Sequence, residues 1–238
     1  MRRAGIVAAY LLTTLSILVN PYGGKAFSNQ IKVQSLSPTP NYSLCTDPQD
    51  IDQLTDEKTG AYPIWIRKSG VGWAQRGPVK ILLTLNDDQH PVNGKILIHT
   101  ARGTQAGVHL PARLDVYTQG KNKQFYHVTG KTMQDKDYAD KTNHWMALEA
   151  NSVHSPFLII IRPNGNYLFI DEIKWEGEKN LRSEAQVLVG DLAACEKDSQ
   201  ERYRQDLLAR IVLPQETHRE WLKAFGTARE VVWVVKNP

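Results

Sequence analysis

The chain has 238 residues, of which 41% are hydrophobic and 23% are charged, a composition that is typical of globular domains and excludes a disordered or collagen-like protein. The formal net charge of +4 depends on Arg2, Arg3 and Lys25, which precede any globular pattern. Without these three residues the basic and acidic side chains nearly balance, so the composition does not support a nucleic-acid-binding protein.

The N-terminal residues follow the order of a secretory signal peptide. A positively charged start precedes an apolar stretch over residues 4–19 and a helix-breaking segment over residues 20–24. Small residues, Ala26 and Ser28, mark a cleavage point. We therefore expect residues 1–28 to be a signal peptide and the mature protein, without a transmembrane span, to be periplasmic or secreted. The alternative is an uncleaved anchor, but the apolar stretch is shorter than the ~20 residues that a membrane span needs.

Two cysteines, Cys45 and Cys195, lie in the expected mature chain. An exported protein meets an oxidising environment in which such a pair can close, so we expect a disulfide. A loop of this length would stabilise the fold by roughly 4–5 kcal/mol in the chain-entropy model. The alternative is two unrelated buried thiols, because a sequence cannot place their Cα atoms within bonding range.

Short apolar and β-branched runs, separated by turn residues, fill the middle of the chain. They are Val79–Leu85, Lys95–Thr100, Arg113–Thr118, Gln124–Thr129, His144–Ala150, Phe157–Arg162 and Asn166–Trp175. Regular spacing without helical patterns in between predicts an antiparallel β-sandwich. In the first run the apolar residues alternate, which places them on one face. The Phe157–Ile161 run is apolar throughout, so we expect it at the centre, covered on both faces.

After the last of these runs the pattern changes. From Arg182 to Leu213 there is no proline, and one approximate helical stripe is formed by Leu188, Leu192, Cys195, Tyr203, Leu207 and Ile211. A second helix over Gln215–Phe225 and a short strand over Val231–Val235 are predicted to follow. We expect a mainly β fold with a sandwich over residues 31–178 and a helical C-terminal extension over residues 179–238.

Three groups of residues resemble one family of β-sandwiches. They are Ser37–Tyr42, Gln53–Asp56 and Val71–Trp73 at the start, Ile98–Thr100, Gly107–Val108, Pro111 and Leu114–Tyr117 in the middle, and Pro163–Ile173 at the end. On these residues, the chain from 31 to 178 resembles the galactose-binding-like jelly-roll family, which includes discoidin-type domains and many carbohydrate-binding modules.

The resemblance implies a calcium site. In this family the early loop commonly carries Leu-Thr-Asp-Gly, and a structural calcium ion often lies between that loop and a carboxylate of the final strand; the matching positions are Asp56, Thr59 and Glu172. Calcium takes six to eight oxygen ligands. Glu57 stands where the family has glycine, so the turn must accept another residue or take another shape. The alternative is a hydrogen bond or salt bridge between loop and strand without a metal.

The resemblance also implies a sugar site on loops at one end of the sandwich. A sugar stacks on an aromatic ring while its hydroxyls take charged or amide partners. The candidates are Arg102, His109, Tyr138, Asn143 and His144. Four tryptophans lie inside or beside predicted strands, where tryptophan usually belongs to the core, namely Trp65, Trp73, Trp145 and Trp175.

These observations imply an exported, non-catalytic module that recognises a glycan such as an envelope polysaccharide. One alternative is a protein-interaction or accessory domain whose partner is another envelope protein. A jelly-roll polysaccharide hydrolase or lyase is the other, and it requires a cleft with convergent ionisable groups. The sequence contains no nucleophile elbow, phosphate loop or dinucleotide fingerprint.

Overall fold

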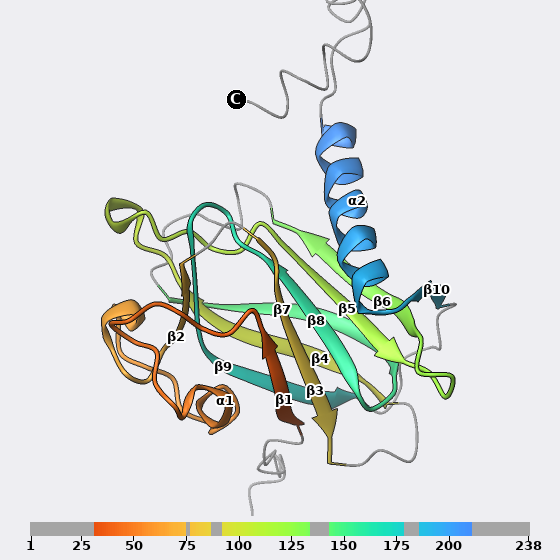
Figure 1. Cartoon of the computed structure of the whole chain (residues 1–238), viewed down its shortest axis with the longest axis horizontal. Coiled ribbons are helices and arrows are strands. Elements are labelled where there is room, and N and C mark those ends of the chain that lie inside the picture. The colour runs from red at the N-terminus through yellow and green to blue at the C-terminus, as the bar shows by residue number, and fades with distance from the viewer. Residues whose placement is uncertain (1–30, 75–76, 87–91, 134–142, 179–185, 211–238) are drawn as a thin grey trace, which may run out of the picture.

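The computed structural model describes residues 31–74, 77–86, 92–133, 143–178 and 186–210, which form two antiparallel sheets packed face to face (Figure 1). The strands are β1 (Ile31–Ser37), β2 (Val71–Ala74), β3 (Val79–Leu85), β4 (Val92–Ala101), β5 (Arg113–Gln119), β6 (Phe125–Thr132), β7 (Asn143–Val153), β8 (Phe157–Arg162), β9 (Tyr167–Glu178) and β10 (Val187–Gly190). The helical elements are α1 (Asp50–Gln53), the 3-10 turns η1 (Ile64–Ile66) and η2 (Thr104–Ala106), and α2 (Leu192–Arg210).

One sheet has six strands in the order β1-β3-β8-β5-β6-β10, and the other has four in the order β2-β9-β4-β7. All seven predicted runs are strands, β3 to β9, although β4, β6, β7 and β9 extend well beyond their predicted ends. The sequence analysis missed β1, β2 and β10. The predicted fold class, an antiparallel β-sandwich followed by a C-terminal helix, is confirmed.

Apolar side chains at alternate positions along the strands form the core between the two sheets. In β3 the residues Val79, Ile81 and Leu83 are fully buried against the other sheet, as predicted. β8 lies between β3 and β5, and both of its faces are buried. Its residues Leu158 and Ile160 point away from the core between the sheets and join a separate cluster. The prediction of a central strand covered on both sides is therefore confirmed.

Each sheet has an outer face with its own cover. Residues 38–70, here called the loop cover, pack on the four-stranded sheet through a cluster of buried residues: Cys45, Ile64, Ala101, Val108 and Phe169. The helix α2, here called the helix cover, lies on the six-stranded sheet (Figure 1). Beneath it is a second cluster, formed by Tyr117, Phe125, Leu158, Ile160 and Cys195.

The predicted disulfide is wrong. Cys45 and Cys195 are both free and buried. Cys45 belongs to the cluster under the loop cover and Cys195 to the cluster under the helix cover. Both sheets lie between these outer faces, so the two sulfur atoms are far beyond bonding range.

The predicted helical stripe starts too early. Residues Val187–Gly190 form β10, which pairs with β6 at the edge of the six-stranded sheet. Gly190 has a φ of +128°, a conformation that glycine adopts readily and other residues avoid. Asp191 then accepts a hydrogen bond from the Ala194 N–H at 2.8 Å and caps the helix. The chain therefore changes from strand to helix within two residues.

Three predictions lie outside the described residues: the signal peptide over residues 1–28, the helix over Gln215–Phe225 and the strand over Val231–Val235. Among the described residues, no helix has the length and apolar character that crossing a membrane requires.

Candidate ligand-binding site

A tight loop follows β4 at one end of the four-stranded sheet. The Gly103 N–H donates to the Val108 carbonyl at 3.0 Å, and the Val108 N–H donates back to Gly103 at 3.1 Å, which closes the loop around η2. Arg102 and His109 flank this bridge, one on each strand of the loop, and both are half-buried. Two of the predicted sugar-binding residues therefore stand side by side.

Two aromatic residues of the loop cover pack against this loop. The Trp65 indole lies directly on Gly103, so that a side chain at Gly103 would overlap the ring. Tyr62 meets Trp65 edge to face, with the ring centroids 5.2 Å apart and the planes at 87°. Tyr62 is 42% exposed and Trp65 is half-buried. We call these two residues the Tyr62–Trp65 pair.

Further aromatic rings support the pair from behind. Phe169 on β9 lies 6.1 Å from Trp65, and Tyr42 meets Phe169 edge to face at 4.9 Å. Tyr167 stacks on Phe169 and borders the same loop at Gly107. An aromatic surface therefore lies on the loop that also carries Arg102 and His109, and aromatic, guanidinium and imidazole groups suit a ligand with both an apolar face and hydroxyl groups.

The remaining predicted sugar-binding residues lie on or before β7. Asn143 and His144 pair with Ala101 and Thr100, so their backbones lie at the same end of the sheet as Arg102. Tyr138 lies outside the described residues. The binding role of these five residues stays a prediction.

The sequence analysis missed the Tyr62–Trp65 pair because it assigned Trp65 to the core. Of the four tryptophans, Trp73 and Trp175 are buried in the core, as expected. The segment Tyr62-Pro63-Ile64-Trp65 carries the overlooked signal. A proline between two aromatic residues favours a turn over a strand, and aromatic residues on a turn are more often accessible to a ligand.

The predicted pairing of Asp56 with Glu172 takes the form of a shared hydrogen-bond donor. The Lys58 backbone N–H donates to Asp56 Oδ1 at 2.9 Å and to Glu172 Oε2 at 3.1 Å. The Lys58 ammonium also pairs with Asp56 at 3.3 Å. Glu57 has a φ of +67°, so the turn accepts a non-glycine residue in the left-handed region. This arrangement, here called the clamp, ties the early loop to β9.

The clamp brings the two carboxylates predicted to bind calcium, Asp56 and Glu172, to one backbone N–H. Its two carboxylates already receive an N–H donor and an ammonium group. Thr59 is exposed on the same loop. In the described part of the chain, no three His, Cys, Asp or Glu side chains come close enough to hold a metal. Calcium binding by Asp56, Thr59 and Glu172 stays a prediction.

A second buried carboxylate lies beside the clamp. Asp171 is fully buried, and its Oδ1 lies 2.5 Å from His99 Nδ1. Its Oδ2 accepts the Gly60 N–H at 2.6 Å. The loop cover therefore donates backbone N–H groups to two neighbouring carboxylates of β9, and these hydrogen bonds fix the loop that leads to the Tyr62–Trp65 pair.

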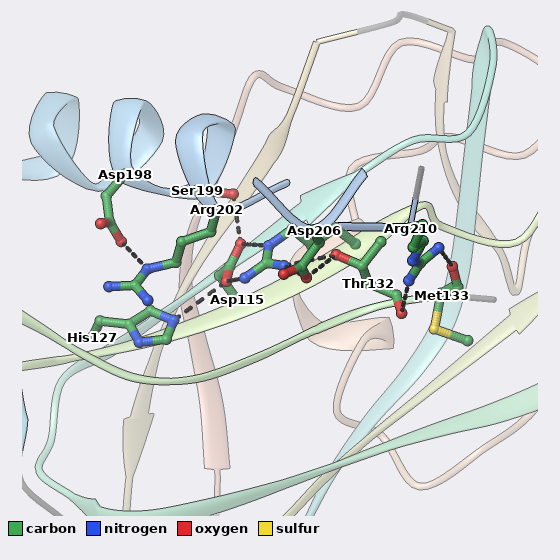
Figure 2. A network of polar contacts seen from close by, with 10 residues as sticks. Asp115, His127, Thr132, Met133, Asp198, Ser199, Arg202, Asp206 and Arg210 are labelled. Carbon is green, nitrogen blue, oxygen red and sulfur yellow. Dashed lines mark hydrogen bonds and ion pairs between the residues drawn. The ribbon is translucent and has the colours of Figure 1, made fainter. Parts of the chain in front are cut away.

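On the opposite face, the helix cover is attached through a network centred on Asp115 (Figure 2). Arg113 donates to both oxygens of this fully buried carboxylate at 2.7 and 2.6 Å. The Ser199 hydroxyl of α2 donates to Oδ2 at 2.7 Å, and His127 Nε2 lies 3.3 Å from Oδ1. Burial raises the pKa of Asp115, but the hydrogen bonds from His127, Arg113 and Ser199 outweigh it, so the pKa is lowered.

Serine, histidine and aspartate meet here, as they do in hydrolase triads, but in a different order. The Ser199 hydroxyl donates to the carboxylate, whereas a nucleophile needs the histidine as its base. Ser199 is also fully buried, so no substrate reaches it. The network attaches α2 to the sheet, and its geometry does not activate a nucleophile.

No family model matches the sequence, and no curated protein matches it. Among solved structures, the chain is similar to CBM32-3 from a family 31 glycoside hydrolase of Clostridium perfringens, with 12% identity, 63% of this chain and 92% of that chain covered, and a TM-score of 0.42. It is similar to CpGH89CBM32-5 from the same organism, solved with GalNAc-β-1,3-galactose, at 11% identity, with 61% and 94% covered and a TM-score of 0.41.

A third similar structure is the C-terminal domain of a chitobiase from Bacteroides fragilis, with 14% identity, 63% and 95% covered, and a TM-score of 0.41. Identities and TM-scores at this level leave the ligand of this chain to be argued from its own residues.

Proposed function

We propose that this chain is an exported, non-catalytic module that binds a glycan at the end of the four-stranded sheet. One observation carries the proposal: the half-buried Trp65, with the exposed Tyr62 against it, packs directly on the loop that carries Arg102 and His109. The aromatic edge offers an apolar surface to the C–H face of a sugar ring. Arg102 and His109 on the same loop offer guanidinium and imidazole groups for hydrogen bonds to hydroxyl groups.

The surroundings of the pair support this role because they hold it in place before a ligand arrives. Trp65 is fixed between Gly103 and Phe169, and the loop itself is closed by two backbone hydrogen bonds. A site whose side chains are already ordered loses little conformational entropy on binding. Tyr62 is the member of the pair that presents the larger exposed fraction to a ligand.

A glycan array tests the proposal, followed by calorimetric titration of the best ligand. We expect Tyr62→Ala and Arg102→Ala each to weaken binding by roughly tenfold or more, since loss of a stacking ring or a charged hydrogen bond costs about 1–3 kcal/mol. Ile51→Ala is the control, because Ile51 is similarly exposed at 41% on the same loop cover but lies in α1. Unchanged affinity in both site variants, or an array without any binding glycan, would overturn the proposal.

Export is the second part of the proposal and depends on residues 1–28. Intact-mass measurement of the protein from the cell exterior or periplasm tests it. The expected mass corresponds to a chain that starts at Asn29, and a membrane-bound chain that retains Met1 would contradict it.

A protein-interaction or accessory domain remains the alternative, and one observation favours it. β10 is an edge strand, and its residues Val187 and Leu188 are 58% and 53% exposed. An exposed apolar edge is a common site of strand addition by a partner. If no glycan binds, and if Leu188→Lys abolishes co-purification of a second envelope protein, this alternative replaces the first.

A further inference from the structure

Two arginines lie directly opposite each other on the outer face of the six-stranded sheet. Arg113 on β5 pairs with Arg162 on β8 in the antiparallel ladder. Arg113 is fully compensated: it binds both oxygens of Asp115, and its Nη1 donates to Asp206 at 2.6 Å and to Thr132 at 2.7 Å. The strand geometry therefore places a second guanidinium next to one whose carboxylates are already engaged.

Arg162 has no comparable partners among the described residues. Its Nε–H is buried and has no hydrogen-bond acceptor in that part of the chain. Its guanidinium lies over the Tyr203 ring, 5.5 Å from the centroid, which is a weaker interaction than an ion pair. Burial lowers the pKa of Arg162, although the nearby Tyr203, Asp115 and Glu196 act to raise it. A partly buried guanidinium whose Nε–H has no acceptor is costly to keep, and an added hydrogen-bond acceptor would relieve that cost.

A pocket of about 440 Å³ opens at Arg162, between α2 and the start of β3. Its lining consists of Pro78, Arg162, Ala193, Glu196, Lys197, Gln200 and Glu201. The two glutamates already have basic partners outside the lining. Glu196 pairs with Lys80 at 2.5 Å, and Glu201 pairs with Arg204 at 2.5 Å. The lining therefore holds two cations, Arg162 and Lys197, and two carboxylates that also bind basic partners outside it.

We propose that this pocket binds a small polar carboxylate, with Arg162 holding the carboxylate group. A planar guanidinium matches a carboxylate through two parallel hydrogen bonds, and Lys197 adds a positive charge at the rim. Gln200 and the oxygens of Glu196 and Glu201 face the same space and accept hydrogen bonds from hydroxyl groups. A singly charged carboxylate suits a lining with two cations and two carboxylates better than a multiply charged phosphate does. The volume suits a ligand of monosaccharide size.

This site is independent of the proposed glycan site. The Arg162 pocket lies under the helix cover, whereas the Tyr62–Trp65 pair lies on the loop cover, with both sheets between them. Two kinds of ligand carry a carboxylate next to a hydroxyl group: acidic sugars and simple hydroxy acids. Titration with one probe of each kind distinguishes them.

The test is calorimetric titration of the full chain with sodium glucuronate, sodium lactate, glucose and sodium sulfate. We expect glucuronate to bind and to raise the melting temperature, while glucose, which lacks the carboxylate, and sulfate do not bind. Lactate binding as tight as glucuronate binding identifies a simple hydroxy acid as sufficient. If lactate binds at least tenfold more weakly than glucuronate, the pocket prefers an acidic sugar. Binding of neither acid, or equal binding of sulfate, would overturn the proposal.

Variants assign the binding to the pocket. Arg162→Gln should weaken glucuronate binding at least tenfold, and Arg162→Lys should restore part of it because a charge without the planar fork remains. Arg67→Gln is the control, since Arg67 is exposed on the loop cover. If Arg162→Gln does not fold, the exposed Lys197→Gln decides: a loss of at least threefold supports the site and no loss refutes it. Tyr62→Ala should leave glucuronate binding at the pocket unchanged, which separates failure here from failure of the glycan proposal.

Discussion

The two covers of the sandwich are attached to their sheets by different chemical groups. Each buries a carboxylate on the outer face of its sheet next to a histidine, Asp171 with His99 and Asp115 with His127. The loop cover reaches its carboxylates through backbone N–H groups, from Lys58 and Gly60. The helix cover reaches Asp115 and its neighbours through side chains.

The difference follows from the backbone of each cover. In α2 the N–H groups beyond the first turn donate to carbonyls within the helix, so only side chains are left to bind the sheet. Asp198 accepts a hydrogen bond from Tyr117. Ser199 binds Asp115, Asp206 binds Arg113 and Thr132, and Arg210 binds the Thr132 and Met133 carbonyls (Figure 2). A loop has free N–H groups, and most residue types can supply them. The attachment of the helix cover therefore depends far more on the identity of its residues than the attachment of the loop cover does.

The largest expected effect comes from replacing the two carboxylates by amides. Asp115→Asn leaves Arg113 buried with a reduced partner, so we expect the free energy of unfolding to fall by about 3–5 kcal/mol. Asp171→Asn keeps an oxygen for the Gly60 N–H, so we expect a loss of only about 1–2 kcal/mol. Denaturant unfolding of both variants measures the difference. Equal losses would show that the two covers do not differ in the way described.

Acid should weaken the helix cover through the same carboxylate. The pKa of Asp115 is lowered in the folded protein, so the folded state binds fewer protons than the unfolded state around the ordinary Asp pKa of about 3.9. Its contribution to stability is therefore present above that pH and is lost as the pH falls through the folded pKa. Unfolding free energies between pH 3 and 6 should show a shallower slope for Asp115→Asn than for the parent chain. An identical slope in both proteins would rule Asp115 out as the source.

The two free thiols report on each cover separately. Burial raises the pKa of Cys45 to about 11 and that of Cys195 to about 12, so both should resist alkylation at pH 8 in the native protein. We expect Asp115→Asn to speed alkylation of Cys195 several-fold and to leave Cys45 unchanged, as measured by peptide mass spectrometry. Parallel acceleration of both thiols would mean that the covers open together, and a peptide linking them would restore the disulfide.

The smallest expected effect concerns calcium at the clamp. If the ion bridges Asp56 and Glu172, the melting temperature rises by a few degrees with calcium and falls with a chelator, because a ligand of the native state stabilises it by mass action. Glu172→Gln should remove this dependence. A melting temperature that does not respond to chelator leaves the Lys58 N–H as the group that joins the two carboxylates.

Strong local patterns were predictable and distant partners were not. The alternation in β3 and the apolar run of β8 identified both strands, because each pattern depends only on neighbouring residues. The attachment of α2 was predicted only in part: Cys195, one of its two buried residues, belonged to the expected apolar stripe, whereas the other, Ser199, is polar and did not. Arg162 carried no local signal, since the missing acceptor of its Nε–H becomes visible only in the folded structure.

The order of strands in the two sheets also has a consequence for biosynthesis. Val71 of β2 pairs with Ile170 of β9, and Val79 of β3 pairs with Ile161 of β8. Such pairings of distant residues close long loops before any contact compensates for the lost chain entropy, and folds that depend on them form slowly, in milliseconds to seconds. A nascent chain on the ribosome therefore holds β2 without its partner, and β3 with β1 as its one available partner, until most of the sandwich has been synthesised.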